Sequence, residues 1–191
     1  MNIRIEVVMS EDLKLAYFVA IKEGASYLGG LLMTNAQGIP TDFRYTEPIT
    51  PTKLQSVLYG KALEPHLRGE VIQKALLKEI KSPPDLMFVR VSDIRDDFST
   101  DAKFPILAVQ LSQEPHLQEP GAISRISARE ILVQISEGAA PLRVLFAQGM
   151  EQSEQELAVP KLIQAGSHMD LAEPMDRTLE ALRSLIQTEE K

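Results

Sequence analysis

The chain has no cysteine and no tryptophan, and only 5% of its 191 residues are aromatic. The absence of cysteine excludes disulfides, thiolate metal ligands and a cysteine nucleophile. The scarcity of aromatic side chains argues against the stacking platforms with which many proteins bind single-stranded nucleic acid. The core must therefore be built mainly from Leu, Ile, Val, Ala and Met.

Long apolar runs are missing as well. No stretch approaches the ~20 apolar residues that a membrane-spanning helix needs, and the N-terminus lacks the pattern of a signal peptide, so we expect a cytoplasmic protein. The net charge is -7. Because affinity for nucleic acid comes largely from Lys and Arg side chains that neutralise phosphates, we do not expect nucleic acid as a partner.

Apolar and polar residues alternate in the first part of the chain, which is typical of half-buried strands. Residues 3–7 and 13–21 predict one antiparallel hairpin. Residues 27–46 predict a second hairpin, with a turn in which Gly38 is available for a positive φ. The adjacent Gly29 and Gly30 inside this hairpin indicate a bulge or the close approach of another backbone.

Helix signals follow the second hairpin. Thr50 and Pro51 predict a helix start, with Thr as the N-cap and Pro at the first helical position. Pro160 is expected to interrupt any helix in the weakly patterned segment 149–167. The other predicted elements are helices from 54 to Gly60, over 63–80 and from Glu173 onward, and strands over 86–91, 104–111, 126–135 and 142–147.

These patterns predict an α/β or α+β fold, with a single mixed β-sheet built from two N-terminal hairpins and later strands and flanked by helices. Residues 1–148 would form the core domain, and an irregular segment and helix over 149–191 would pack on it. The element order over 13–91 is similar to the opening of a ribonuclease H-like fold, and a profilin- or roadblock-like sheet is a comparable alternative. Nucleases of the first fold place an Asp in the middle of the first strand, whereas residues 13–21 contain no acidic residue.

The densest acidic cluster, residues 93–101, comes just after a predicted buried strand. Ligands in open α/β sheets bind outside the carboxyl ends of strands, and Mg²⁺ takes oxygen ligands. One hypothesis is therefore a site for Mg²⁺ or Mn²⁺ formed by Asp42, Asp93, Asp96 and Asp97, provided that the strand of Asp42 lies beside the strand that ends at Asp93. The simpler interpretation is a solvated acidic loop and a polar strand face.

No other motif indicates a reaction. The glycines form neither a phosphate-binding loop nor a dinucleotide fingerprint, and no nucleophile elbow is present. The six Lys and Arg residues noted between 50 and 81 alternate with Glu, which is typical of a surface, although a phosphate-facing helix pair is an alternative.

Two functional hypotheses follow. The first is a non-catalytic binding or assembly module that works through a protein–protein interface and needs no cofactor, with a homodimer as its simplest version. The alternative is a divalent-metal-dependent enzyme that acts on a phosphate ester or nucleic acid.

Overall fold

The computed structural model describes residues 13–94 and 102–189. Its strands are β1 (Leu15–Glu23), β2 (Ser26–Thr34), β3 (Pro40–Tyr45), β4 (Leu86–Phe88), β5 (Ile106–Leu111), β6 (Ile123–Ser127), β7 (Glu130–Val133) and β8 (Leu142–Phe146). Its helical segments are α1 (Lys53–Tyr59), η1 (Gly60–Ala62), α2 (Leu63–Pro65), η2 (His66–Gln73), α3 (Lys74–Glu79), α4 (Gln152–Gly166) and α5 (Glu173–Glu189).

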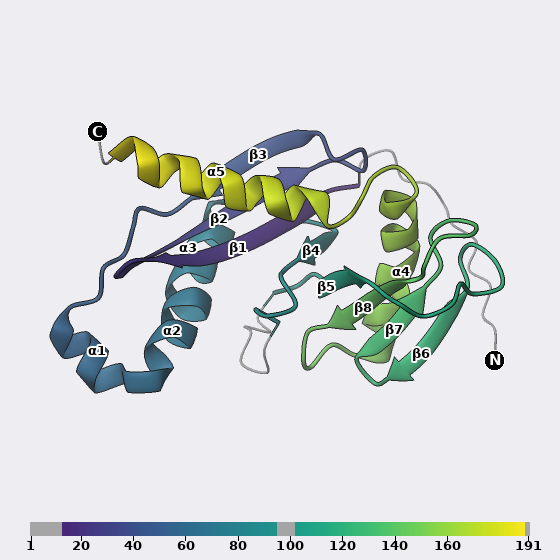
Figure 1. Ribbon diagram of the computed structural model, residues 1–191, viewed down its shortest axis with the longest axis horizontal. Coiled ribbons are helices and arrows are strands. Elements are labelled where there is room, and N and C mark those ends of the chain that lie inside the picture. Colours follow the sequence, from purple (N-terminus) through teal and green to yellow (C-terminus); the bar gives the residue numbers. More distant parts are fainter. Residues whose placement is uncertain (1–12, 95–101, 190–191) are drawn as a thin grey trace.

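All eight strands form one mixed sheet in the order β3-β2-β1-β4-β5-β8-β7-β6 (Figure 1). β1 pairs with β2 in antiparallel register along its whole length, and β1, β4 and β5 run parallel to one another. β4 pairs only with Leu15, Ala16 and Tyr17 of β1. The carboxyl half of β1 therefore extends beyond the end of β4. Its backbone hydrogen-bonding groups on that side need a partner other than a strand.

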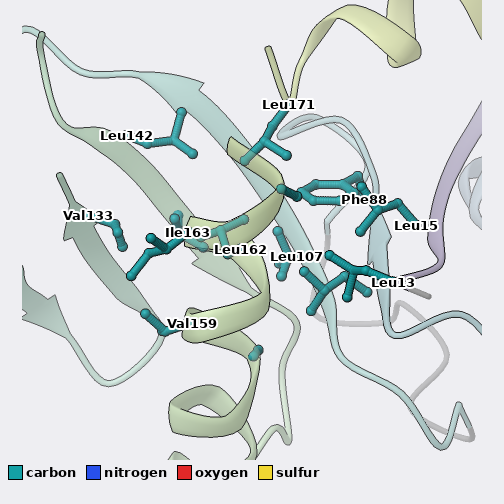
Figure 2. Packing of buried hydrophobic residues seen from close by; sticks show 14 of the residues in the cluster. Leu13, Leu15, Phe88, Leu107, Val133, Leu142, Val159, Leu162, Ile163 and Leu171 are labelled. Atoms are coloured by element: carbon teal, nitrogen blue, oxygen red, sulfur yellow. The ribbon is translucent and has the colours of Figure 1, made fainter. Parts of the chain in front are cut away.

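Helices cover both faces of the sheet. On one face, α4 packs its buried side chains against apolar residues of β4, β5, β7 and β8 (Figure 2), and Leu182 of α5 packs on β1 and β2. On the other face, Ile72 of η2 and Leu76 of α3 pack against Ala16, Phe18 and neighbouring residues. The alternation along β1 thus divides its side chains between two apolar cores, as expected for a central strand covered on both faces.

The expected fold class, a single mixed sheet flanked by helices, is confirmed. The second hairpin is also confirmed: β2 and β3 pair around a turn in which Gly38 has a φ of 76°. The first hairpin falls partly on residues outside the described part of the chain.

The close approach expected at the double glycine is found as well. A Cβ on Gly29 would lie 2.2 Å from Ile72 Cγ2, so the helix of Ile72 lies directly against the backbone of β2. Only a residue without a side chain allows this distance.

Three local predictions were wrong. The first helix is capped by Thr52, whose side chain accepts a hydrogen bond from the Gln55 N–H in a capping box, rather than by Thr50. Residues 126–135 do not form one strand, because a turn at Ala128 and Arg129 separates β6 from β7. Pro160 lies inside α4 and does not end it, since tertiary packing of the helix overrides the local preference.

The predicted helix over 63–80 exists, but 8 of its residues, those of η2, have π geometry. Such segments occur frequently at functional sites because they shift the side chains that follow to a new angle. Across residues 13–94 and 102–189, no helix has the length and apolar character needed to cross a membrane.

Candidate site at the carboxyl ends of the central strands

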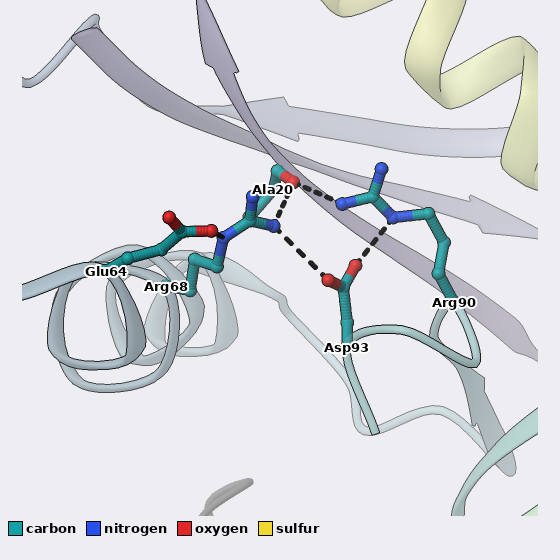
Figure 3. A network of polar contacts seen from close by, with 5 residues as sticks. All are labelled: Ala20, Glu64, Arg68, Arg90 and Asp93. Carbon is teal, nitrogen blue, oxygen red and sulfur yellow. Dashed lines mark hydrogen bonds and ion pairs between the residues drawn. The ribbon is translucent and has the colours of Figure 1, made fainter. Parts of the chain in front are cut away.

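Two arginine side chains meet at the edge of β1 that β4 leaves unpaired (Figure 3). Arg68 Nη1 and Arg90 Nη2 each donate to the Ala20 carbonyl oxygen at 2.6 Å. The same two guanidinium groups bind Asp93: Arg90 Nε lies 2.6 Å from Oδ2, and Arg68 Nη1 lies 3.2 Å from Oδ1. Glu64 Oε1 accepts a hydrogen bond from Arg68 Nε at 3.0 Å. We call these five residues the arginine cluster.

Three separate elements bring the arginine cluster together. Arg68 comes from η2, one helical turn after its ion-pair partner Glu64. Arg90 follows the last residue of β4 by two positions, and a turn in which the Asp93 N–H donates to the Arg90 carbonyl places both side chains on one side. Ala20 belongs to the part of β1 that β4 does not reach, so the two guanidinium groups satisfy a carbonyl that has no strand partner there.

The cluster is largely withdrawn from solvent. The Asp93 side chain is only 9% exposed, against 19% for Arg68 and 30% for Arg90. Two guanidinium groups face two carboxylates, so the formal charges balance. A charge as buried as that of Asp93 is stable only when it is paired and hydrogen-bonded, and here both of its oxygens are.

The middle of β1 carries no carboxylate. The only titratable residues of the strand are Tyr17 near its middle and Lys22 and Glu23 at its end. Burial raises the pKa of the Tyr17 hydroxyl far above its ordinary value, so the phenol stays protonated and contributes no negative charge. The strand that holds an Asp in ribonuclease H-like nucleases is therefore uncharged here over its central part.

Of the four proposed metal ligands, the structure describes Asp42 and Asp93, and it does not bring these two together. Asp42 lies on the edge strand β3 and pairs with Arg44, whose Nε is 3.0 Å from Asp42 Oδ2. β2 and β1 separate β3 from β4, which puts the two strands roughly 14 Å apart. The condition under which Asp42 and Asp93 would share a metal is therefore not met. Asp96 and Asp97 lie outside the described residues.

The described residues also do not fit a divalent metal on their own. Within 13–94 and 102–189, no three His, Cys, Asp or Glu residues gather closely enough to hold an ion. Among the described residues, Asp93 is the proposed ligand that follows β4, and each of its oxygens already accepts from an arginine. A metal bound there would have to compete with two guanidinium groups.

The opposite end of β4 carries a different contact. Asp85 accepts from Lys161 Nζ at 2.8 Å and from the Lys14 N–H at 3.0 Å. Burial by itself would raise the pKa of Asp85, but these hydrogen bonds outweigh it and hold the pKa below its ordinary value. The contact joins α4 to the start of β4, so it lies at the opposite end of the strand from the arginine cluster.

A cavity of about 1080 Å³ lies between α4 and the edge strand β6. Its lining is mixed, from Ile123 and Leu157 to Arg125 and Gln155. Arg125 and Gln155 hydrogen-bond to each other at 3.1 Å, so these two polar groups are already paired.

Sequence reasoning found only part of the arginine cluster. It singled out Asp93 as a metal ligand and counted Arg68 among the surface cations, but it gave Arg90 no role. The available signal was the position of Arg90 just after a buried strand, where a buried cation requires a partner. The contact with Ala20 joins residues 70 positions apart and is set by strand order, which local patterns do not reveal.

No family model matches the chain, and its sequence matches no curated protein. The fold, in contrast, has clear relatives among solved structures. The endonuclease V of Streptomyces avermitilis is similar with a TM-score of 0.59 and 11% identity, over 95% of this chain and 84% of that one. The catalytic domain of human endonuclease V gives 0.55 and 13%, over 94% and 85%. Ciona intestinalis endonuclease V, in complex with a 23mer DNA containing an inosine followed by a ribo-adenosine, gives 0.55 and 10%, over 93% and 87%.

The fold is therefore of the endonuclease V type, in the ribonuclease H-like class, and not profilin- or roadblock-like. Three expectations are corrected by these matches. The non-catalytic module working through a protein–protein interface is not supported, because the similar structures are endonucleases. The expectation of no cofactor is wrong for the same reason, since enzymes that cleave phosphodiesters commonly rely on Mg²⁺. Nucleic acid was wrongly set aside as a partner, since one of the similar structures holds DNA.

Proposed function

We propose that this protein binds nucleic acid across the carboxyl ends of β1 and β4. The observation that carries the proposal is the convergence of Arg68 and Arg90 at this edge, in a fold of the endonuclease V type. Ligands of open α/β sheets bind outside the carboxyl ends of the strands. The DNA-bound Ciona protein makes nucleic acid the ligand class to test first.

The second candidate function is metal-dependent hydrolysis of the bound strand, which the likeness to endonucleases favours. It needs Mg²⁺ or Mn²⁺ and carboxylates to hold the ion. Asp93, Asp96 and Asp97 are the residues we propose for this role, because all three follow β4 within a few positions. The central part of β1 supplies no carboxylate, so any metal site of this chain differs from the arrangement in which the first strand provides an Asp.

The experiment is a binding and cleavage assay with the full chain. The probe is a fluorescein-labelled 23mer DNA that contains one inosine followed by a ribo-adenosine, the kind of DNA bound by the Ciona protein. A second 23mer without the inosine is the matched control. We expect saturable binding that weakens as salt is raised, because each neutralised phosphate releases counterions.

The same samples, incubated with Mg²⁺ or Mn²⁺ and with EDTA, test hydrolysis. Cleavage that requires the metal and is lost in Asp96→Asn or Asp97→Asn supports the second candidate. Binding without cleavage in any metal leaves the first candidate standing and removes the second. Absence of binding to either 23mer at low salt refutes both.

A further inference from the structure

We propose that Arg68 and Arg90 are the phosphate-binding groups of this nucleic-acid site, and that Asp93 is the internal anion that holds them in position until a phosphate arrives. The inference rests on the proposed nucleic-acid function and specifies its contacts. It also explains why the described residues do not fit a metal ion: the positive charges at the strand ends are those of guanidinium groups.

The geometry of the two side chains suits a phosphate. Both arginines already share a carbonyl oxygen and a carboxylate, so they lie close enough for one phosphate to bridge them. A guanidinium group presents planar, paired donors that match a phosphate better than the single point charge of lysine does. Within the described part of the chain, Arg68 Nη2 and Arg90 Nη1 donate to no protein acceptor, so each side chain retains donor capacity.

The Ala20 carbonyl and Asp93 fix where those donors lie. Figure 3 shows the two guanidinium groups on either side of the Ala20 oxygen, with Asp93 reaching both of them. Four hydrogen bonds at 2.6 to 3.2 Å therefore hold the pair before any ligand is present. Donors held in advance lose less conformational entropy on binding than free surface arginines.

Asp93 also opposes the ligand. Its carboxylate and that of Glu64 neutralise the two arginines in the free protein, so a phosphate gains from the cluster only in competition with Asp93. Removing the charge of Asp93 should strengthen binding, whereas removing either arginine should weaken it. If the arginine cluster only stabilises the fold, binding should weaken in every variant, Asp93→Asn included.

The test measures the Kd and its salt dependence by fluorescence anisotropy with the 23mer DNA. Arg68→Gln and Arg90→Gln should each raise the Kd at least about tenfold, since hydrogen bonds to charged groups are among the strong ones. Each should also reduce the slope of log K against log salt by about 0.7 for a single strand or 0.9 for a duplex. Asp93→Asn should lower the Kd severalfold.

Arg177→Gln is the matched control. Arg177 of α5 likewise donates to a backbone carbonyl, that of Gly38, and to a carboxylate, that of Glu173, each at 2.9 Å. Its side chain is 36% exposed, close to the 30% of Arg90. It lies at the turn between β2 and β3, away from the proposed site, so its loss should leave the Kd and the salt slope unchanged.

Arg90→Lys controls for misfolding, because it keeps the positive charge and loses only the planar, paired donors of the guanidinium group. It should retain the wild-type salt slope and bind with an intermediate Kd, and the Tm of every variant is recorded alongside. The inference is overturned if wild type binds but Arg68→Gln and Arg90→Gln bind as Arg177→Gln does, or if Asp93→Asn weakens binding as much as the arginine variants do. If wild type itself does not bind, the proposed function fails first.

Discussion

Gly29→Ala is the sharpest test of how the helix η2 is placed on the sheet. The new Cβ would lie 2.2 Å from Ile72 Cγ2, whereas carbon atoms in contact rest about 3.5 to 4.0 Å apart. Ile72 is completely buried, and its branched Cβ leaves it one strongly preferred χ1 rotamer in a helix. The helix must therefore shift away from β2, and it carries Arg68 with it.

Forcing an extra methyl group into a packed core typically lowers the free energy of unfolding by about 1 to 3 kcal/mol. For a protein of this size, each kcal/mol lowers the Tm by about 2 to 4 °C. Gly69→Ala is the matched control on η2 itself, because a Cβ there meets no atom within 4 Å. Replacing this helical glycine should raise the stability by about 0.5 to 1 kcal/mol.

Urea unfolding followed by circular dichroism measures both variants. Ile72→Ala removes the Cγ2 atom, so the loss caused by Gly29→Ala should shrink in that background, with a coupling of about 0.5 to 3 kcal/mol in a double-mutant cycle. The reasoning is refuted if Gly29→Ala unfolds at the same urea concentration as wild type. A strict sum of the two single effects in the double variant would refute it too.

Three further predictions concern stability. Gln73 is fully buried, and neither atom of its amide has a hydrogen-bond partner among the described residues. Gln73→Met should therefore raise the free energy of unfolding by about 1 to 3 kcal/mol, seen as a higher urea midpoint, whereas a lower midpoint would show that the amide is satisfied. The folded-state pKa of Asp85 is depressed, so the contact with Lys161 stabilises the protein above the ordinary carboxyl value of 3.8 and is lost as the pH falls through the folded pKa. The midpoint difference between wild type and Asp85→Asn should therefore be constant near neutral pH and vanish in acid, and it should be small because the pair is partly exposed. Pro160→Ala restores a helical N–H inside α4 and should raise the Tm by several degrees, whereas an unchanged Tm would mean that the helix already accommodates the ring.

Local signals in the sequence were sufficient for most of the sheet. The strand that contains β1 was recognised, although β1 is buried on both faces rather than half-buried. The turn at Gly38 is visible because it needs a positive φ. The double glycine was also interpretable, because only a residue without a side chain fits where the helix contacts the strand closely.

The failures have a common physical origin. α4 was missed because Pro160 is a local signal, while the helix is held by the burial of Val159, Leu162 and Ile163 against strands distant in sequence. The turn that splits β6 from β7 has no Gly or Pro, so no residue there indicates a break. Strand order was likewise out of reach, since the parallel pairing of β1 with β4 joins segments about 70 residues apart.

The same limit explains why the sequence did not reveal the partners of Asp93. An aspartate just after a buried strand is compatible with a metal ligand or with the partner of a cation, and the sequence contains nothing that decides between them. The structure adds that two arginines, one in η2 and one just after β4, reach the same carboxylate. The fold was therefore easier to predict than the ion pairs at the carboxyl ends of its central strands.

Asp93→Asn separates the two roles proposed for Asp93, metal ligand and partner of the arginines, because they predict opposite results. If Asp93 holds a metal, its loss should abolish the rise in Tm that Mg²⁺ or Mn²⁺ gives to wild type, since an ion bound only by the folded state stabilises it by mass action. If Asp93 instead balances Arg68 and Arg90, wild type should show no such rise, and the variant should bind DNA more tightly than wild type. One substitution, assayed once with metal and once with DNA, therefore decides whether the carboxyl edge of this sheet presents carboxylates to an ion or guanidinium groups to a phosphate.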